Sequence, residues 1–203
     1  MFKANSLLVF VIKVFILLPL CYWLWYSSAE SSTFLAVYFS EPVLQSLFPG
    51  LIAGIEQNGY LVEVVANVTV PAQNVPRGMI AELPVPVNPL IYSYGLPLTL
   101  ALILASPINH VKTGLNILIS IFIFLLIQVW GISFESLKVL FLQTPPELLA
   151  NNRLDPGQLD FIALGYQLGA LILPAVTPII IWVFCYQKYI ALLTRGLLNN
   201  KQG

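Results

Sequence analysis

Long uninterrupted apolar stretches dominate the hydrophobic pattern of this chain. Three of them, Leu7–Tyr26, Leu115–Phe134 and Phe161–Tyr186, have the roughly 20 residues that a helix needs to cross the hydrocarbon core of a bilayer. A fourth, Tyr92–Ile108, is shorter, but it carries no charge and turn formers flank it. The pattern predicts an integral membrane α-helical protein with four transmembrane helices, at residues 1–27, 92–108, 115–134 and 161–186.

The first apolar stretch fits two interpretations. Lys3 before it and the small residues "SSA" at 27–29 after it are typical of a cleaved signal peptide. Its length and the aromatic cluster "YWLWY" at 22–26 favour a retained helix, because amphipathic rings gather at the membrane interface. We expect retention and keep cleavage as the alternative.

Residues 33–55 repeat apolar positions at roughly helical spacing, with interruptions at Pro42 and at Pro49–Gly50. The stretch is too broken to span a bilayer, and it predicts a surface helix at 33–55. The predicted apolar side consists of Phe34, Val37, Tyr38, Leu44, Leu47 and Phe48. This side would lie on the membrane surface or pack on the next element of the chain.

The pattern changes to strict alternation at residues 59–70, where an aliphatic face opposes a mixed face. This is typical of a half-buried strand, and a return strand is expected at 79–87 after turn residues at 71–78. Because an isolated hairpin is marginal in water, this small β-hairpin/α module at 28–91 must pack on the surface helix, the membrane or a partner.

The segment "NPLIYSYGLP" at 88–97 joins the predicted module to the second predicted membrane helix. Asn88 is a favourable helix N-cap, with Pro89 at the first helical position. Tyr92 and Tyr94 are placed at headgroup level, where the ring is apolar and the hydroxyl stays wet. We interpret the segment as a joint that sets the angle of the module, and we count Asn88, Tyr92 and Tyr94 as candidate partner-binding residues.

Composition and charge support this arrangement and orient it. Hydrophobic residues make up 58% of the chain and charged residues 9%, against about 25% charged in a typical soluble domain. The N-terminus, the loop at 109–114 and the tail at 187–203 contain five basic residues and no acid; they are Lys3, Lys112, Lys188, Arg195 and Lys201. Because basic residues are enriched in cytoplasmic loops, both termini are predicted to be cytoplasmic, and the module at 28–91 and the loop at 135–160 extracytoplasmic.

Polar residues near the outer ends of the third and fourth predicted helices form a second candidate site. These candidate partner-binding residues are Gln128, Glu135, Tyr166 and Gln167. Gly165 and Gly169 form a small-xxx-small pattern that favours close helix packing. The polar side chains would make interhelical hydrogen bonds or recognise an extracytoplasmic segment or a lipid.

Residues for catalysis or metal binding are absent from the predicted outer site. The only histidine, His110, is predicted on the cytoplasmic side, and no nucleophile with a base can be placed beside it. No metal-binding, cofactor-binding or nucleic-acid-binding motif occurs. The two cysteines, Cys21 and Cys185, are predicted at different depths and therefore unpaired. We expect no enzyme, no cofactor and no nucleic-acid partner.

Pro174 and Pro178 predict a kink in the fourth helix. A kinked helix can border a groove, so a small transporter or lipid-handling membrane protein is the alternative functional interpretation. The sequence shows no inverted repeat, which most transporters of this kind would have.

Four ordered motifs resemble the exosortase H-associated membrane protein family of bacteria. They are "LFPG…IEQNG" at 47–59, "VNPLIYSYGLPLTLAL" at 87–102, "QVWGISFESLK" at 128–138 and "IALGYQLGALILPAVTPIIIW" at 162–182. The resemblance implies a setting in a Gram-negative bacterium, beside an exosortase that processes proteins with a C-terminal sorting tail, and no catalytic residues to carry over. We expect a non-catalytic accessory protein of this sorting system in the bacterial inner membrane. Exosortases use Cys, Arg and His, whereas Cys21, Arg153 and His110 of this chain are predicted at mismatched depths or sides. The expected partners are therefore the lipid bilayer and an exosortase or its tailed substrate.

Overall fold

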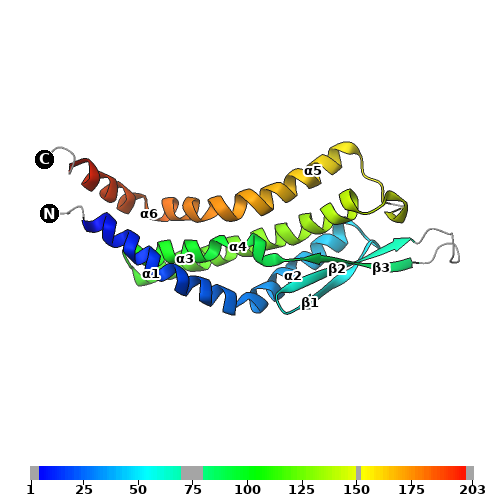
Figure 1. The fold of residues 1–203 in the computed structure, drawn as a ribbon, viewed down its shortest axis with the longest axis horizontal. Coiled ribbons are helices and arrows are strands. Elements are labelled where there is room, and N and C mark those ends of the chain that lie inside the picture. The colour runs from blue at the N-terminus through cyan, green and yellow to red at the C-terminus, as the bar shows by residue number, and fades with distance from the viewer. Residues whose placement is uncertain (1–4, 70–79, 150–151, 200–203) are drawn as a thin grey trace. The chain divides into compact units, whose positions relative to one another are not determined.

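The computed structural model describes residues 5–69, 80–149 and 152–199, so the turn predicted at 71–78 lies outside the described residues. The chain divides into two compact units (Figure 1). Unit 1 consists of Met1–Ser28, Tyr94–Phe124 and Pro174–Gly203, and unit 2 consists of Ala29–Ser93 and Leu125–Leu173.

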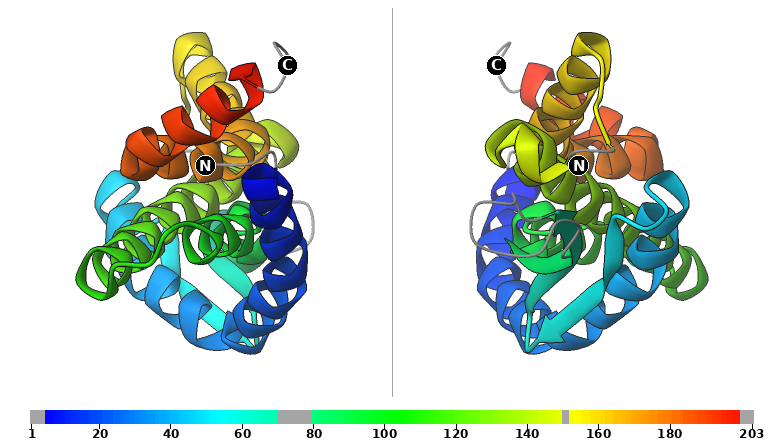
Figure 2. Two further views of the ribbon diagram at one scale, coloured as in Figure 1. Left: turned by 90° about the vertical axis from the view of Figure 1, so that its left-hand side faces the viewer. Right: turned by 90° about the vertical axis from the view of Figure 1, so that its right-hand side faces the viewer.

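Unit 1 is built from helices alone in its described part. They are α1 (Asn5–Ser27), α3 (Gly95–Ala105), the first half of α4 (His110–Lys138) and nearly all of α6 (Leu173–Asn199). Helices α1 and α3 lie side by side, as both views in Figure 2 show. The start of α3 also approaches α6 closely, because a Cβ at Gly95 would overlap the backbone carbonyl oxygen of Pro174.

The core of unit 1 is aromatic. Phe10 of α1 stacks on Trp182 of α6 with ring centroids 5.3 Å apart, and Tyr189 meets Phe10 edge-on at 5.9 Å. The indole N–H of Trp182 donates a hydrogen bond to the hydroxyl of Ser106 at 2.9 Å. This contact fixes the end of α3 on α6.

Unit 2 contains a sheet, a helix beside it and the halves of two long helical segments. Its elements are α2 (Ala29–Leu47), β1 (Ile52–Asn58), β2 (Leu61–Thr69), β3 (Ile80–Val87), the 3-10 helix η1 (Pro89–Tyr92), the second half of α4, the π-helical turn η2 (Val139–Gln143), the 3-10 helix η3 (Pro146–Leu149), α5 (Pro156–Gln167) and the π-helical turn η4 (Leu168–Ile172). The three strands are antiparallel in the order β1-β2-β3.

The aliphatic face of β2 is buried, as the alternation predicted. Val62, Val64, Ala66 and Val68 are all at most 5% exposed. Helix α2 packs on the sheet, and most of its buried residues are small. Its buried residues are Ala29, Thr33, Ala36, Val37, Ser40 and Leu44.

The predicted surface helix at 33–55 is corrected in its extent. Helix α2 begins at Ala29, continues through Pro42 and ends at Leu47. Residues from Ile52 onward form strand β1, because they pair with β2 across a tight turn in which Gly59 adopts φ 64°. The sheet therefore has three strands rather than two. Of the predicted apolar side, Val37 and Leu44 are buried, whereas Phe34, Tyr38 and Leu47 are exposed.

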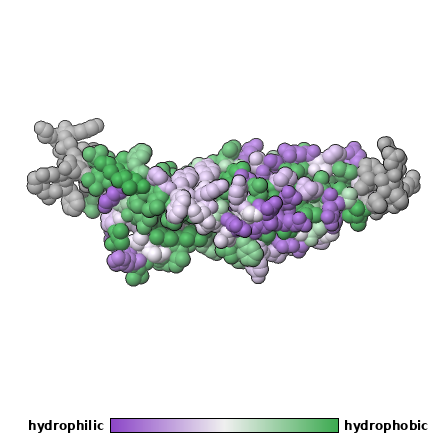
Figure 3. All heavy atoms as spheres, turned by 60° about the horizontal axis from the view of Figure 1, so that its bottom comes forward, coloured by the Kyte–Doolittle hydropathy of each residue, from purple (hydrophilic) through white to green (hydrophobic). Residues whose placement is uncertain are grey.

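Three helical segments are long and apolar enough to cross a membrane among the described residues: Leu7–Ser27, His110–Gln143 and Pro156–Leu193. Their large apolar side chains remain widely exposed, and hydrophobic areas are prominent on the face in Figure 3. The fourth predicted span contains only the 11-residue helix α3, about 16 Å long at 1.5 Å per residue, against a hydrocarbon core of about 30 Å. The structure thus gives three candidate spans, and a fourth stays a prediction.

The segment predicted as a loop at 135–160 is largely helical in its described part. Helix α4 runs to Lys138, η2 and η3 follow, and α5 begins at Pro156. The cap of α5 explains this early start: Asp155 and Gln158 form a capping box, with Pro156 at the first helical turn.

The helix predicted at 161–186 continues to Asn199, with two departures from regular α-helix. The π-helical turn η4 spans Leu168–Ile172 and ends just before Pro174, and Tyr186 has non-helical dihedral angles of φ −125° and ψ 26°. Proline and π-turns are common causes of kinks. The predicted kink at Pro174 and Pro178 stays a prediction, because the dihedral angles of α6 depart from helical values only at Tyr186. Nothing in the sequence predicted the irregularity at Tyr186.

Candidate functional site

Tyr92 is the centre of a buried polar cluster in unit 2. It ends helix η1, whose first turn is fixed by Asn88: the Asn88 side-chain oxygen accepts a hydrogen bond from the backbone N–H of Leu90 at 3.2 Å. The Tyr92 side chain is fully buried. Its ring lies directly on Gly131 of α4, where any Cβ would overlap ring carbons.

The Tyr92 hydroxyl is aimed at a carboxylate. It donates a hydrogen bond to Oε2 of Glu135 at 2.8 Å. Glu135 lies one helical turn beyond Gly131, so the glycine supports the ring while the carboxylate receives the hydroxyl. A hydrogen bond to an ionised acceptor is roughly twice as strong as a neutral one.

Gln128 holds the same face of α4 against the preceding joint. Its amide Nε2 donates to the hydroxyl of Ser93 at 3.1 Å and to the carbonyl of Pro89 at 3.5 Å. Gln128 is almost fully buried. Positions 128, 131 and 135 follow helical spacing, so one stripe of α4 receives the whole of η1.

A second stripe of α4 packs on α5. The indole N–H of Trp130 donates to the backbone carbonyl of Gly165 at 2.9 Å. Gly165 also lies on the ring of Phe134, where a Cβ would overlap, and a Cβ at Gly169 would crowd Trp130. Trp130 and Phe134 stack at 4.4 Å.

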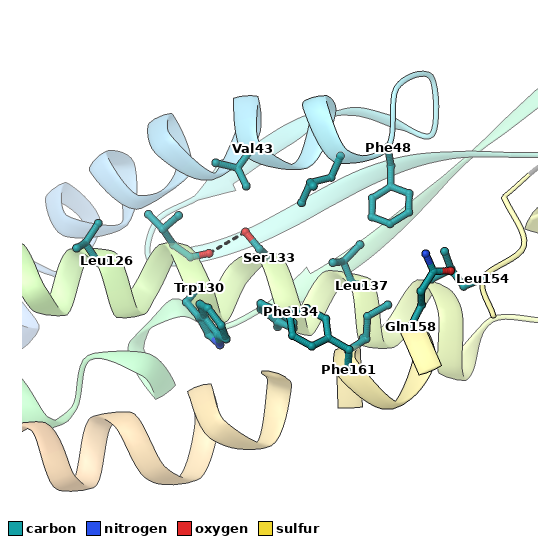
Figure 4. Close-up of a pocket in the computed structure, with 13 residues that line it drawn as sticks. Val43, Phe48, Leu126, Trp130, Ser133, Phe134, Leu137, Leu154, Gln158 and Phe161 are labelled. Carbon is teal, nitrogen blue, oxygen red and sulfur yellow. Dashed lines mark hydrogen bonds between the residues drawn. The ribbon is translucent and has the colours of Figure 1, made fainter. Parts of the chain in front are cut away.

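An apolar cavity of about 570 Å³ opens beside these rings (Figure 4). We call it the apolar groove. Its walls come from the end of α2 with the residue after it, from α4, and from α5 with a residue just before its cap. They are Val43, Leu47, Phe48, Leu126, Val129, Trp130, Ser133, Phe134, Leu137, Leu154, Gln158, Phe161 and Ile162.

The polar groups of the apolar groove are few, and most of them are bonded within the protein. The hydroxyl of Ser133 donates to the carbonyl of Val129 at 2.8 Å, as the dashed line in Figure 4 shows. The side chain of Gln158 accepts from the backbone N–H of Asp155 at 3.0 Å. The groove therefore favours an apolar occupant, because a polar occupant would find few free donors or acceptors there.

The structure brings together some of the predicted site residues and separates others. Tyr92 bonds Glu135, and Gln128 bonds the joint that Asn88 begins. Of the remaining three, Tyr166 borders this cluster, whereas Tyr94 and Gln167 do not join it. The Tyr166 ring lies under Nζ of Lys138 at 3.9 Å, Gln167 is exposed, and Tyr94 belongs to unit 1, where its backbone carbonyl accepts from the Tyr22 hydroxyl at 3.3 Å.

Several residues of the site were not predicted. Gly131, Trp130 and Phe134 shape it, and the only sequence signal was a glycine flanked by apolar and aromatic residues within "QVWGISF" at 128–134. Within the described ranges, no three His, Cys, Asp or Glu side chains lie close enough to hold a metal ion.

Comparison with known proteins gives one match. The model of the family described as exosortase H-associated membrane protein matches residues 4–189. We found no matching curated protein and no matching solved structure.

Proposed function

The chain belongs to the exosortase H-associated membrane protein family, and we propose that it is a non-catalytic accessory subunit of an exosortase-type sorting system in the bacterial inner membrane. The family match over residues 4–189 is the observation that carries this proposal. The role we assign is docking: unit 2 binds the exosortase or the apolar tail of its substrate.

The proposed orientation places unit 2 outside the cytoplasm. All nine acidic residues of the chain fall in unit 2, whereas unit 1 contains six of the nine basic residues and no acid. Basic residues concentrate on the cytoplasmic side of membrane proteins. This bias supports cytoplasmic termini and an extracytoplasmic sheet.

The apolar groove is the proposed docking site. Two of its walls, α4 and α5, lie within candidate membrane spans, so an occupant would be reached at membrane level. In lipid, helices associate through close packing rather than through the hydrophobic effect. A concave wall of aromatic and aliphatic side chains offers such packing to an apolar helix of a partner.

The polar cluster around Tyr92 has a supporting role in this proposal. It fixes one stripe of α4 through the bonds of Gln128 and Glu135, and the Trp130 bond to Gly165 fixes the next stripe on α5. A wall that is held in place before binding loses less conformational entropy when the partner docks. The cluster thus keeps the apolar groove open in one shape.

Affinity purification of the tagged full chain from its native membranes tests the proposal. We expect co-purification of an exosortase or a protein with a C-terminal sorting tail. Phe161→Ala, in the apolar groove, should lower this recovery roughly tenfold, because aromatic anchors dominate binding energies. Leu164→Ala is the matched control: both residues lie on α5 with similar exposure, 62% and 64%, but Leu164 does not line the groove.

Three outcomes would contradict all or part of this proposal. Recovery of the chain without either partner would contradict the accessory role itself. If Phe161→Ala and Leu164→Ala lower the recovery of the partner equally, the accessory role would stand, but the apolar groove would not be the docking site. Co-purification of lipid alone would favour the lipid-handling alternative.

A further inference from the structure

A second cavity lies in unit 1 and has a different character. We call this cavity, of about 470 Å³, the basic cavity. Two stretches of chain line it: the start of α4 with the loop before it, and α6 on both sides of Tyr186. The lining residues on which the argument depends are Asn109, Lys112, Phe184, Tyr186, Lys188 and Tyr189.

The basic cavity holds two lysines with no acid to balance them. Lys112 comes from α4 and Lys188 from α6, and both are exposed. None of the nine Asp and Glu residues of the chain belongs to unit 1. Two ammonium groups that line one cavity repel each other. An anion between them would attract both and offset this repulsion.

Further donors and the break in α6 complete the cavity. The side-chain oxygen of Asn109 accepts from the backbone N–H of Lys112 at 3.4 Å, which leaves the Asn109 amide nitrogen as a donor. At Tyr186 the helix departs from regular geometry, so residues before and after the break both line the cavity.

The basic cavity also lies at the ends of candidate membrane spans. One span begins at His110 and another ends at Leu193. Phe184, Tyr186 and Tyr189 stand among its walls, and aromatic side chains of this kind gather at the headgroup level of a bilayer. An anion available at this depth is a lipid phosphate.

We propose that the basic cavity binds the phosphate group of an anionic phospholipid. Lys112 and Lys188 donate to the phosphate oxygens from two helices, Asn109 adds an amide donor, and the aromatic walls contact the glycerol and upper acyl region. Binding would hold the break in α6 against the start of α4. This inference uses unit 1 alone and does not depend on the docking role of unit 2.

The test uses the purified full chain in detergent, with bound lipid counted by native mass spectrometry. We expect retention of phosphatidylglycerol over phosphatidylcholine. Lys112→Gln and Lys188→Gln should each weaken the retention of phosphatidylglycerol about fivefold. This factor corresponds to the attraction of about 1 kcal/mol that one basic residue contributes near an anionic lipid surface. Lys13→Gln is the matched control, because it removes the same charge from unit 1 but does not line the cavity.

A parallel arm adds inorganic phosphate to the lipid-stripped protein and follows its melting temperature. A second result is that phosphate raises the melting temperature only when both lysines are present, while the protein shows no preference for phosphatidylglycerol. This combination would support a phosphate site but assign it to a soluble ion. Equal retention of the two lipids together with no response to phosphate would overturn the proposal. Equal losses from Lys13→Gln and Lys112→Gln would also overturn it. Both lysines are exposed, so the variants should fold normally, which circular dichroism checks.

Discussion

Gly131→Ala is expected to destabilise the protein by about 3 kcal/mol, at the upper end of the cost of overpacking a core. The new methyl group would occupy the position of the Tyr92 ring. The ring cannot move aside easily, because it is fully buried and its hydroxyl is bonded to Glu135. Thermal unfolding of the purified protein in detergent measures the effect.

Gly114→Ala provides the control for this substitution. Gly114 lies on the same helix, α4, but a Cβ there meets nothing within 4 Å. Alanine favours a helix interior by up to about 1 kcal/mol over glycine, so this variant should unfold at the same or a higher temperature. A Gly131→Ala protein as stable as the Gly114→Ala protein would show that Tyr92 does not pack on α4 as described.

Tyr92→Phe is expected to cost about 2 kcal/mol, within the range for a lost hydrogen bond to a charged group. The substitution keeps the ring on Gly131 but removes the hydroxyl that donates to Glu135. The half-buried carboxylate of Glu135 then lacks this hydrogen bond. Tyr38→Phe is the control, because the Tyr38 side chain is 66% exposed on α2 of the same unit. The free energy of unfolding of the Tyr38→Phe variant should equal that of the unsubstituted protein.

A double-mutant cycle separates the bond from the general loss of a hydroxyl. Glu135→Met removes the acceptor, and the Tyr92→Phe/Glu135→Met double variant removes both partners. If the two side chains are hydrogen-bonded, the double variant should lose less free energy of unfolding than the sum of the losses in the two single variants. Strict additivity would contradict the pairing.

The sequence predicted those parts of the fold that depend on local periodicity. Strict alternation identified the buried face of β2, from Val62 to Val68, and the apolar runs identified the three candidate membrane spans. Strand β1 was missed because Ile52–Asn58 does not alternate and forms a strand only through its pairing with β2. The Asn58–Gly59 pair was a usable hairpin signal.

The site was harder to predict because it depends on contacts between distant positions. Tyr92 and Glu135 were both candidates, but their bond requires the register of η1 on α4, which a single sequence does not contain. The sequence also left open whether the apolar side of α2, with residues such as Phe34, lies on the membrane surface or packs on the next element. In the structure Phe34 is exposed, and small residues such as Ala36 are among those that are buried.

Photo-crosslinking in native membranes tests the apolar groove as a docking site most directly. A photoreactive amino acid would replace Phe161, inside the groove, or Leu164, which has equal exposure on the same helix but lies outside it. We expect an adduct with an exosortase or a tailed substrate from position 161 and little or none from position 164. Equal adducts from the two positions, or only lipid adducts from position 161, would contradict it.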